Sequence, residues 1–506
     1  MSHIARSSLI VAILFGLEKL LGFARQIMIA RQFGLSTDLD AFNAANNIPD
    51  LLFALISGGA LAVAFIPVLS EYLSTRGRSA MWELFSRIAN LVFLVTAGLS
   101  IVVAIFAHQL VGWRLGIAPG FSSEQQFLVA ELMRINLIAT LLFSLSGLTI
   151  AALQSNQHFF LPALAPSMYD IGSLFGVIIL SPETGYQIGP ITLPAFGLGI
   201  YGLVYGTILG AALFLAIQIP GMLRYHFHWT PRIDLHNPGV RQVLSLMGPR
   251  VLTVLFIQMI FLVQDNIASR LATGSVSSLV YGWLFMQVPE TIIGTAIATV
   301  LLPTLSEQIA RLDRDAFRLT MNHTLRVILS LTIPSALLLG VAIHPVVGIL
   351  GFDETGTGLV AWVARMFFVG LIGHSLLEVA ARSFYAQQDA RTPLKIASLN
   401  VVVFVILAIL LGFSLGAPGI ALANSLAFTI QALILLFLLN RRFHGLLNVR
   451  STLIRVVPAS IVAAVLAYGL LQLPFPALPL AILSMAVGGA VVLPFIWPEL
   501  KMLIKL

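Results

Sequence analysis

Long apolar runs separated by short polar loops extend along almost the whole chain. A membrane-spanning helix needs ~20 mostly apolar residues, and on this rule the pattern predicts about fourteen helices. A first group is expected at 7–33, 40–70, 84–112, 126–153, 158–181 and 196–219. A second group is expected at 242–270, 276–305, 320–350, 358–385, 393–415 and 417–440, followed by two more helices at 453–473 and 476–497.

The composition indicates the same fold class. Of the 506 residues, 58% are hydrophobic and only 10% are charged, which excludes a soluble domain because too much apolar surface would face water. We therefore expect an all-α integral membrane protein. The chain has no cysteine, so disulfides and thiolate metal sites are excluded. Its net charge of +7 comes without a basic tail or interleaved aromatic and basic residues, so no nucleic-acid partner is indicated.

Basic side chains gather in alternate loops. One set of loops contains Arg76, Arg78, Arg224, Arg232, Arg241, Arg311, Arg314 and Arg318. Loops on the opposite side are poor in basic residues, and Lys and Arg are absent from 181–195, 351–357 and 413–418. By the positive-inside rule, both termini are expected in the cytoplasm.

The two groups of six helices repeat one another. Asn47-Ile48-Pro49-Asp50 recurs as Gln287-Val288-Pro289-Glu290, and Gln157 and Pro162 recur as Gln388 and Pro393. Six spans per repeat make both halves enter the membrane in the same direction, as in transporters that bind substrate between parallel repeats. We expect one lobe at 1–220, a second at 221–445, and two additional helices at 446–506.

Two predicted helices carry ionisable residues at membrane depth. The first has a stripe of Glu18, Gly22 and Arg25 with Lys19 beside it, and the second has a stripe of Asp40, Asn43, Asn47 and Asp50. Ionised groups within a membrane normally face a bundle interior or a watery cavity. Two such stripes facing each other across water would line a translocation path; buried salt bridges between two helices are the alternative.

Other predicted spans contain further ionisable residues. Glu131 and Arg134 stand three residues apart, and Glu378 and Arg382 stand four apart. These spacings favour pairs that neutralise themselves. Asp170 has no partner nearby in its own helix, which favours a place on the wall of a cavity.

The chain lacks the sequence signatures of several enzyme classes. It contains no GxxxxGK[ST] phosphate loop, no HExxH zinc motif and no GxSxG nucleophile motif. A transporter is therefore favoured over an enzyme or an ATP-driven pump. We expect no metal site and no resident cofactor, with energy supplied by a monovalent cation gradient or by the membrane potential.

Several motifs resemble those of the MurJ (MviN) lipid II flippases. They are LGFAR at 21–25, TDLDAF at 37–42, IPDLL at 48–52, FIPVLSEY at 65–72 and FYAQQDARTPLKIA at 384–397. The resemblance covers nearly the whole chain. It implies the multidrug/oligosaccharidyl-lipid/polysaccharide exporter fold, in which two six-helix lobes form a V-shaped central cavity and the last two helices form a groove for a lipid tail.

The resemblance also implies a function. Members of this family move the undecaprenyl-diphosphate-linked peptidoglycan precursor from the inner to the outer leaflet of the bacterial cytoplasmic membrane. Lys19 and Arg25 match the family's cavity cations and are expected to hold the diphosphate. Residues expected to act in gating or cation coupling are Glu18, Asp40, Asp50 and Glu290. Phe53 and Leu284 stand where the family has arginines, so the candidate substitutes are Arg134, Arg365 and Arg382.

Two alternatives stand beside the flippase hypothesis. The same scaffold could export another lipid-linked saccharide or a cationic amphiphile, for which the binding groups would be Glu18, Asp50, Asp170 and Glu290. The chain could instead be a non-transporting membrane scaffold that recruits cell-wall synthesis enzymes. The expected partners are accordingly the polyprenyl-diphosphate-linked precursor, membrane lipids and, in the last case, those enzymes; no oligomeric state is indicated.

Overall fold

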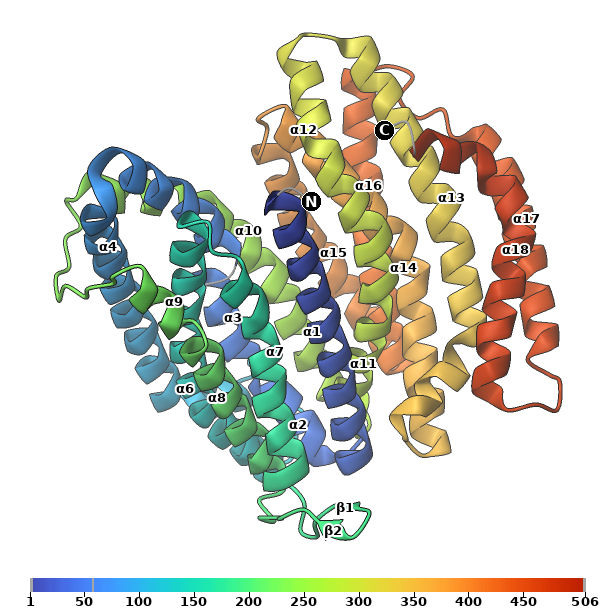
Figure 1. The fold of residues 1–506 in the computed structure, drawn as a ribbon. Coiled ribbons are helices and arrows are strands. Elements are labelled where there is room, and N and C mark those ends of the chain that lie inside the picture. Colours follow the sequence, from blue (N-terminus) through green and yellow to red (C-terminus); the bar gives the residue numbers. More distant parts are fainter. Residues whose placement is uncertain (1–2, 57–58, 504–506) are drawn as a thin grey trace. The chain divides into compact units, whose positions relative to one another are not determined.

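The computed structural model is almost entirely helical (Figure 1). It describes residues 3–56 and 59–503. The chain divides into two compact units, Met1–Asn266 (unit 1) and Ile267–Leu506 (unit 2). Within the described residues, 11 helices are long and apolar enough to cross a membrane. The predicted all-α membrane fold is confirmed.

Unit 1 contains the following elements, of which α10 runs across the boundary between the units: α1 (His3–Phe33), α2 (Thr37–Ala45), α3 (Asn47–Ile56), α4 (Gly59–Ile105), α5 (Ala107–Gly112), α6 (Ser123–Ser155), α7 (Phe160–Phe175), the π-helical turn η1 (Gly176–Leu180), α8 (Ile200–Ala216), α9 (Ile219–Arg224) and α10 (Pro238–Ala268). A small hairpin between α7 and α8 is formed by β1 (Gln187–Ile188) and β2 (Ile191–Thr192), which pair antiparallel.

The predicted second span, 40–70, is not one helix. Ser36 caps α2 by accepting a hydrogen bond from the Leu39 N–H (3.2 Å), and α2 ends at Ala45. The break before α3 lies at Asn46, whose side chain accepts a hydrogen bond from Asn136 of α6 (2.6 Å). The following helix, α4, turns back at Gly77, where φ is +84°, a conformation that glycine adopts without steric cost. The second and third predicted spans therefore meet within α4.

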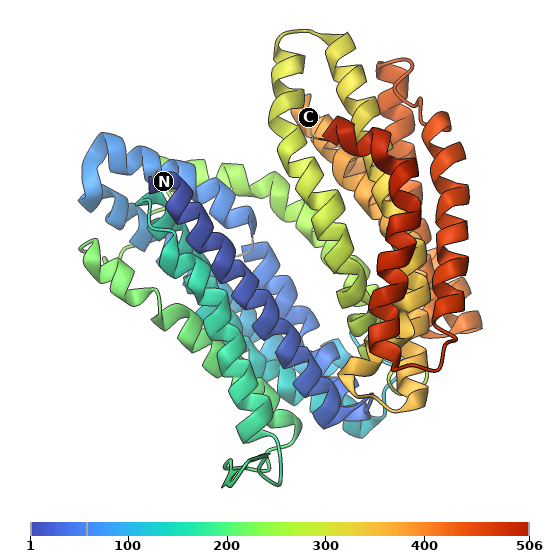
Figure 2. The same ribbon diagram turned by 45° about the vertical axis from the view of Figure 1, so that its right-hand side comes forward.

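Unit 2 contains α11 (Ser275–Glu290), the π-helical turn η2 (Thr291–Thr295), α12 (Ala296–Ala310), α13 (Arg314–Val347), the 3₁₀ turn η3 (Gly348–Leu350), α14 (Glu354–Ala386), α15 (Arg391–Leu415), α16 (Ala417–Arg442), α17 (Arg450–Leu470) and α18 (Ala477–Leu503). The last two helices pack on each other and on α13 (Figure 2).

A buried carboxylate joins these last two helices to α13. Glu499 of α18 accepts hydrogen bonds from Arg326 of α13 (3.0 Å) and from Thr452 of α17 (2.8 Å), and it also pairs with Arg455. Its side chain is 0% exposed. A carboxylate buried this deeply is retained only when cations and hydrogen bonds compensate it, so this cluster ties three helices together.

Both units pair their helices in the same way. In unit 1, α4 packs on α6, and α8 packs on both α6 and α7. In unit 2, α13 packs on α14, and α16 packs on both α14 and α15. Gln157 and Gln388 both have φ of +60°, and the residue after each donates its N–H to the carbonyl five residues earlier, at 2.9 and 3.0 Å. The predicted internal repeat is confirmed.

The motif at 384–397 forms the turn between α14 and α15. Arg442 of α16 pairs with Asp389 (2.6 Å), and Thr392 donates its hydroxyl to the same carboxylate (2.7 Å). Burial alone would raise the pKa of Asp389, but the hydrogen bonds from Thr392 and Arg442 lower it to about 2. The ionised carboxylate therefore holds this turn against α16.

Glycines allow α8 to cross α7 and the following turn η1 at close distance. A Cβ added at Gly206 of α8 would lie 2.6 Å from the Gly176 Cα, and one added at Gly176 would lie 2.7 Å from the Gly202 carbonyl oxygen. Small residues spaced four apart let membrane helices approach this closely. The crossing matters for function because α7 and α8 both line the cavity described below.

We predict that Gly206→Ala lowers the free energy of unfolding by about 1–3 kcal/mol, because the added methyl group must push two backbones apart. Unfolding in mixed micelles with increasing denaturing detergent measures this change. The matched control is Gly98→Ala in α4, where an added Cβ meets no atom within 4 Å, so stability should stay the same or rise. Equal losses in both variants would contradict the close crossing.

Candidate functional site

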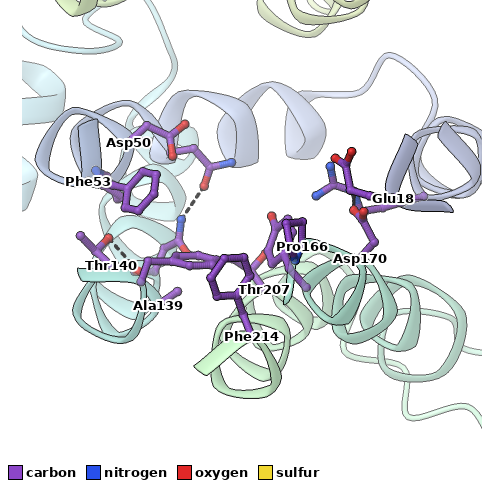
Figure 3. Close-up of a pocket in the computed structure, with 15 residues that line it drawn as sticks. Glu18, Asp50, Phe53, Ala139, Thr140, Pro166, Asp170, Thr207 and Phe214 are labelled. Atoms are coloured by element: carbon purple, nitrogen blue, oxygen red, sulfur yellow. Dashed lines mark hydrogen bonds and ion pairs between the residues drawn. The ribbon is translucent and has the colours of Figure 1, made fainter. Parts of the chain in front are cut away.

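A cavity of about 350 Å³ lies inside unit 1 (Figure 3). It is lined by side chains from α1, α3, α6, α7 and α8 and by Asn46 between α2 and α3. Its polar and ionisable lining residues are Glu18, Arg25, Asn46, Asp50, Asn136, Thr140, Tyr169, Asp170 and Thr207. The wall thus includes one guanidinium and three carboxyl groups.

The centre of one wall is an ion pair between α1 and α7. Arg25 Nε lies 3.2 Å from Asp170 Oδ1, with 20% and 3% of the two side chains exposed. The same guanidinium lies 5.0 Å from the centre of the Tyr169 ring. Gly22 lies against this pair, since a Cβ there would be in ordinary van der Waals contact with Asp170 Oδ2, at 3.6 Å. Each charge neutralises the other where an isolated charge would be costly.

The other carboxyl groups lie at two places on the wall. Figure 3 shows Glu18 beside Asp170 on one side and Asp50 with Phe53 on the other. Asp50 is exposed, and no ion pair reaches it from the described residues. The lining is therefore acidic overall, with Asp50 the carboxylate left uncompensated by a neighbouring cation.

Aromatic rings form the apolar part of the wall. The Phe143 ring lies 5.6 Å from Phe53, 5.4 Å from Tyr169 and 5.6 Å from Phe214, measured between ring centres. Edge-to-face and tilted contacts of this kind are favourable. They hold the wall rigid and lower the local dielectric, which strengthens the electrostatic interactions of the charged residues opposite.

The structure separates the other residues of the predicted stripes from this wall. The Lys19 side chain is 82% exposed and pairs with Glu18 at 3.2 Å, and it does not line the cavity. Asp40 is buried in α2 with 1% exposed. Glu290 belongs to unit 2, where its carboxylate accepts a hydrogen bond from Thr295 of η2 (3.1 Å). Of the two predicted stripes, Glu18, Arg25 and Asp50 reach the cavity.

The candidate substitute arginines hold backbone carbonyls. Arg134 donates to Ala104 O and Arg365 to Gly340 O, each at 2.8 Å. Arg382 donates to Thr295 O (3.1 Å). These guanidinium groups bond to backbone carbonyls of neighbouring helices, and the wall of the described cavity is built without them.

The predicted local ion pairs have different outcomes. The pair of Glu378 and Arg382 is confirmed, at 3.0 Å. The predicted ion pair between Glu131 and Arg134, which both lie in the described part of the chain, is wrong. Glu131 instead accepts a hydrogen bond from the Tyr201 hydroxyl (2.6 Å). The packing of α8 on α6 brings this hydroxyl to the carboxylate.

Sequence reasoning missed several neutral residues of the site. Asn136 and Thr140 lie one turn apart on α6 and face the cavity with Thr207 of α8. Their spacing of four was a usable signal, since polar groups one turn apart in an apolar helix share a face. The prediction that Asp170 lines a cavity is confirmed.

These features define the class of protein. A multi-pass helical bundle that maintains ionisable side chains around an internal cavity has the architecture of a membrane transporter. The profile described as "Lipid II flippase MurJ" matches residues 29–484. The chain belongs to the MurJ family of lipid II flippases.

Curated relatives support this assignment. The lipid II flippase MurJ of Burkholderia cenocepacia is 30% identical over 436 residues, which cover 84% of this chain and 82% of the relative. The probable lipid II flippase MurJ of Rhizobium meliloti is 29% identical, with 94% and 89% of the two chains covered. That of Vibrio cholerae is 28% identical, with 84% and 81% covered.

Solved structures show the same fold. A lipid II flippase MurJ in an inward closed conformation superposes with a TM-score of 0.79 at 24% identity, covering 98% of this chain and 100% of the other. An inward-facing multidrug resistance MATE family transporter of the MOP superfamily superposes with a TM-score of 0.68 at 14% identity, covering 85% and 95%. The predicted exporter fold is confirmed.

We predict energetic coupling between Arg25 and Asp170. Replacing either residue by Ala leaves a charge without its partner in the membrane interior, whereas the double variant removes both charges. A double-mutant cycle of unfolding free energies should therefore give a coupling of about 1–3 kcal/mol.

The matched control pair is Glu307 of α12 and Arg311, the residue directly after that helix, with side chains 60% and 75% exposed. An exposed pair one turn apart on a helix should show a coupling of only about 0.3–0.5 kcal/mol. Additive losses at Arg25 and Asp170 would show that their proximity contributes no stability.

Proposed function

We propose that this protein translocates lipid II, the undecaprenyl-diphosphate-linked peptidoglycan precursor, from the inner to the outer leaflet by alternating access. Its membership of the MurJ family over residues 29–484 supports this proposal, as do curated relatives named lipid II flippases. The structural observation that carries it is the Arg25 guanidinium on the wall of a cavity inside a membrane-spanning bundle.

The chemistry of the substrate explains the need for such a cation. A diphosphate cannot cross hydrocarbon without groups that replace its hydration. The planar guanidinium of Arg25 matches two phosphate oxygens. It is already neutralised by Asp170, so the substrate must compete with this carboxylate. Lys19 is exposed and paired with Glu18, so in this proposal it acts outside the cavity lining, as a cation that an approaching diphosphate meets on the same helix.

Competition for Arg25 suggests a coupling mechanism. When a phosphate takes the guanidinium, the Asp170 carboxylate loses its counter-ion in a region where a bare charge is costly. Uptake of a proton or another monovalent cation near Glu18, Asp50 and Asp170 would then compensate it. In this proposal Asp40 and Glu290 act in gating away from the cavity, and the membrane potential contributes to the driving force.

The acidic lining supports a second candidate function. Three carboxyl groups face one guanidinium in this cavity, a balance that suits an organic cation better than a diphosphate. A cationic amphiphile exporter would bind its substrate at Asp50, where no ion pair is found among the described residues. Arg25 would then serve only to position Asp170.

The proposed setting is the bacterial cytoplasmic membrane. The alternation of basic loops supports cytoplasmic termini, with the undecaprenyl tail remaining in lipid beside α17 and α18. Cell-wall synthesis enzymes that consume the flipped precursor are the proposed protein partners.

Complementation of cells depleted of their own lipid II flippase tests the two functions. We expect the wild-type chain to restore growth and outer-leaflet lipid II, and Arg25→Glu to abolish both, because a carboxylate repels the diphosphate. Arg365→Gln is the control, since its guanidinium holds the Gly340 carbonyl and should be dispensable for substrate binding.

Normal flipping by Arg25→Glu at wild-type membrane levels would refute a role for Arg25 in holding the diphosphate. Failure of the wild-type chain to restore flipping, combined with efflux of a lipophilic cation that Asp50→Asn abolishes, would favour the cation exporter.

A further inference from the structure

Unit 1 contains a second cavity that the proposed transport mechanism does not use. It has a volume of about 360 Å³ and lies among α4, α6, α8, α9 and the segment 225–232, which leads from α9 towards α10. Apolar side chains dominate its wall, among them Phe85, Phe93, Leu145, Leu215, Phe227 and Trp229. Water is a poor occupant of such a space because it finds few hydrogen-bond partners there.

The segment 225–232 is held in place as one wall of this cavity. Trp82 of α4 donates its indole N–H to Tyr225 O (2.9 Å), and Asn90 donates to Thr230 O (2.8 Å). The Trp229 indole N–H in turn donates to Asn90 Oδ1 (2.8 Å). These bonds connect three points of the segment to a single helix. The cavity is therefore formed by the fold itself.

Aromatic packing fixes the same wall from inside. The Phe227 ring lies 5.1 Å from Trp82 and 5.6 Å from Phe85, both edge-to-face. Trp82 is fully buried. Phe227 therefore cannot swing into the cavity to fill it without giving up both ring contacts.

The mouth of the cavity lies at a surface suited to lipid. Phe93 is 45% exposed and Trp229 61% exposed. The next two residues of α4, Leu94 and Val95, are also exposed. All three lie within a span apolar enough to cross the membrane. Tryptophan is enriched where hydrocarbon meets headgroups. An acyl chain can thus enter from the bilayer beside Phe93.

One arginine lies beside this mouth, and a second lies at the other end of the segment 225–232. The Arg78 guanidinium lies 5.4 Å from the centre of the Tyr225 ring, and the backbone carbonyl of Arg232 accepts a hydrogen bond from Asn90 (3.1 Å). Both arginine side chains are exposed. The carboxylates closest in sequence are Glu83, which pairs with Arg87 at 3.5 Å, and Asp234, which accepts from the His236 N–H (2.9 Å). The excess of positive charge suits a phosphate headgroup.

We propose that this cavity binds one anionic phospholipid, with an acyl chain between Phe93 and Trp229 and the headgroup phosphate at Arg232. The lipid is a bound component of unit 1 and not the transported substrate. The site is independent of Arg25 and of the other cavity, so it stands whether or not the chain flips lipid II.

Quenching of Trp229 fluorescence by brominated acyl chains tests this site. The full chain is placed in phosphatidylcholine nanodiscs that contain either brominated phosphatidylglycerol or the same amount of brominated phosphatidylcholine. The Trp229 signal is the difference between the wild type and Trp229→Phe. We expect strong quenching by brominated phosphatidylglycerol and much weaker quenching by the zwitterionic lipid.

Two kinds of variant separate the acyl-chain site from the headgroup site. Ala89→Leu fills the cavity from α4 and should abolish the preferential quenching; Leu215→Phe fills it from α8 and serves if the first variant does not fold. Arg232→Gln should weaken the apparent affinity for phosphatidylglycerol about fivefold, the factor expected for one basic residue at an anionic surface. Arg314→Gln, on an exposed helix start in unit 2, should leave it unchanged.

Three outcomes would overturn the proposal. Equal quenching by both lipids would show that Trp229 merely lies at the membrane surface. Quenching that persists with the cavity filled would place the bromine outside it. Displacement of brominated phosphatidylglycerol by undecaprenyl phosphate at matched headgroup charge would assign the cavity to the polyprenyl tail of the substrate.

Discussion

Charge neutralisation within the membrane is the constraint on which the structure depends most. Arg25 and Asp170 stand on different helices, and each is acceptable at that depth only because the other is 3.2 Å away. The same constraint recurs at Glu499, where two arginines and a threonine surround one carboxylate. Helix packing in this protein is therefore arranged around charges as much as around apolar contacts.

Arginines serve two distinct purposes in this bundle. Arg25 faces a cavity and a carboxylate, so a substrate anion can compete for it. Arg134 and Arg365 instead donate to backbone carbonyls of neighbouring helices. The lining of the described cavity therefore contains a single guanidinium, and its selectivity depends on how Asp170, Glu18 and Asp50 balance that one cation.

The sequence was sufficient to predict the helical membrane fold and its repeat, because hydrophobic run length and motif order are local properties. It also identified Glu18, Arg25, Asp50 and Asp170 as residues near water, since an ionisable group in a span has few other places to be. It could not predict that Lys19 lies outside the cavity lining, because this depends on which face of α1 the neighbouring helices cover. Nor could it find the Tyr201–Glu131 bond, which depends on how α8 packs on α6.

The two halves of the repeat differ in what surrounds their equivalent positions. A shift of 231 residues relates Arg134 to Arg365 and Gln157 to Gln388, and both pairs keep the same backbone role. Under that shift, the cavity residues Asn136, Thr140 and Asp170 correspond to Phe367, Leu371 and Val401, of which Phe367 and Leu371 are completely buried. One half thus has a polar hollow where the other has hydrocarbon at the equivalent positions. The same helix connections therefore accommodate either solvation or packing at these positions.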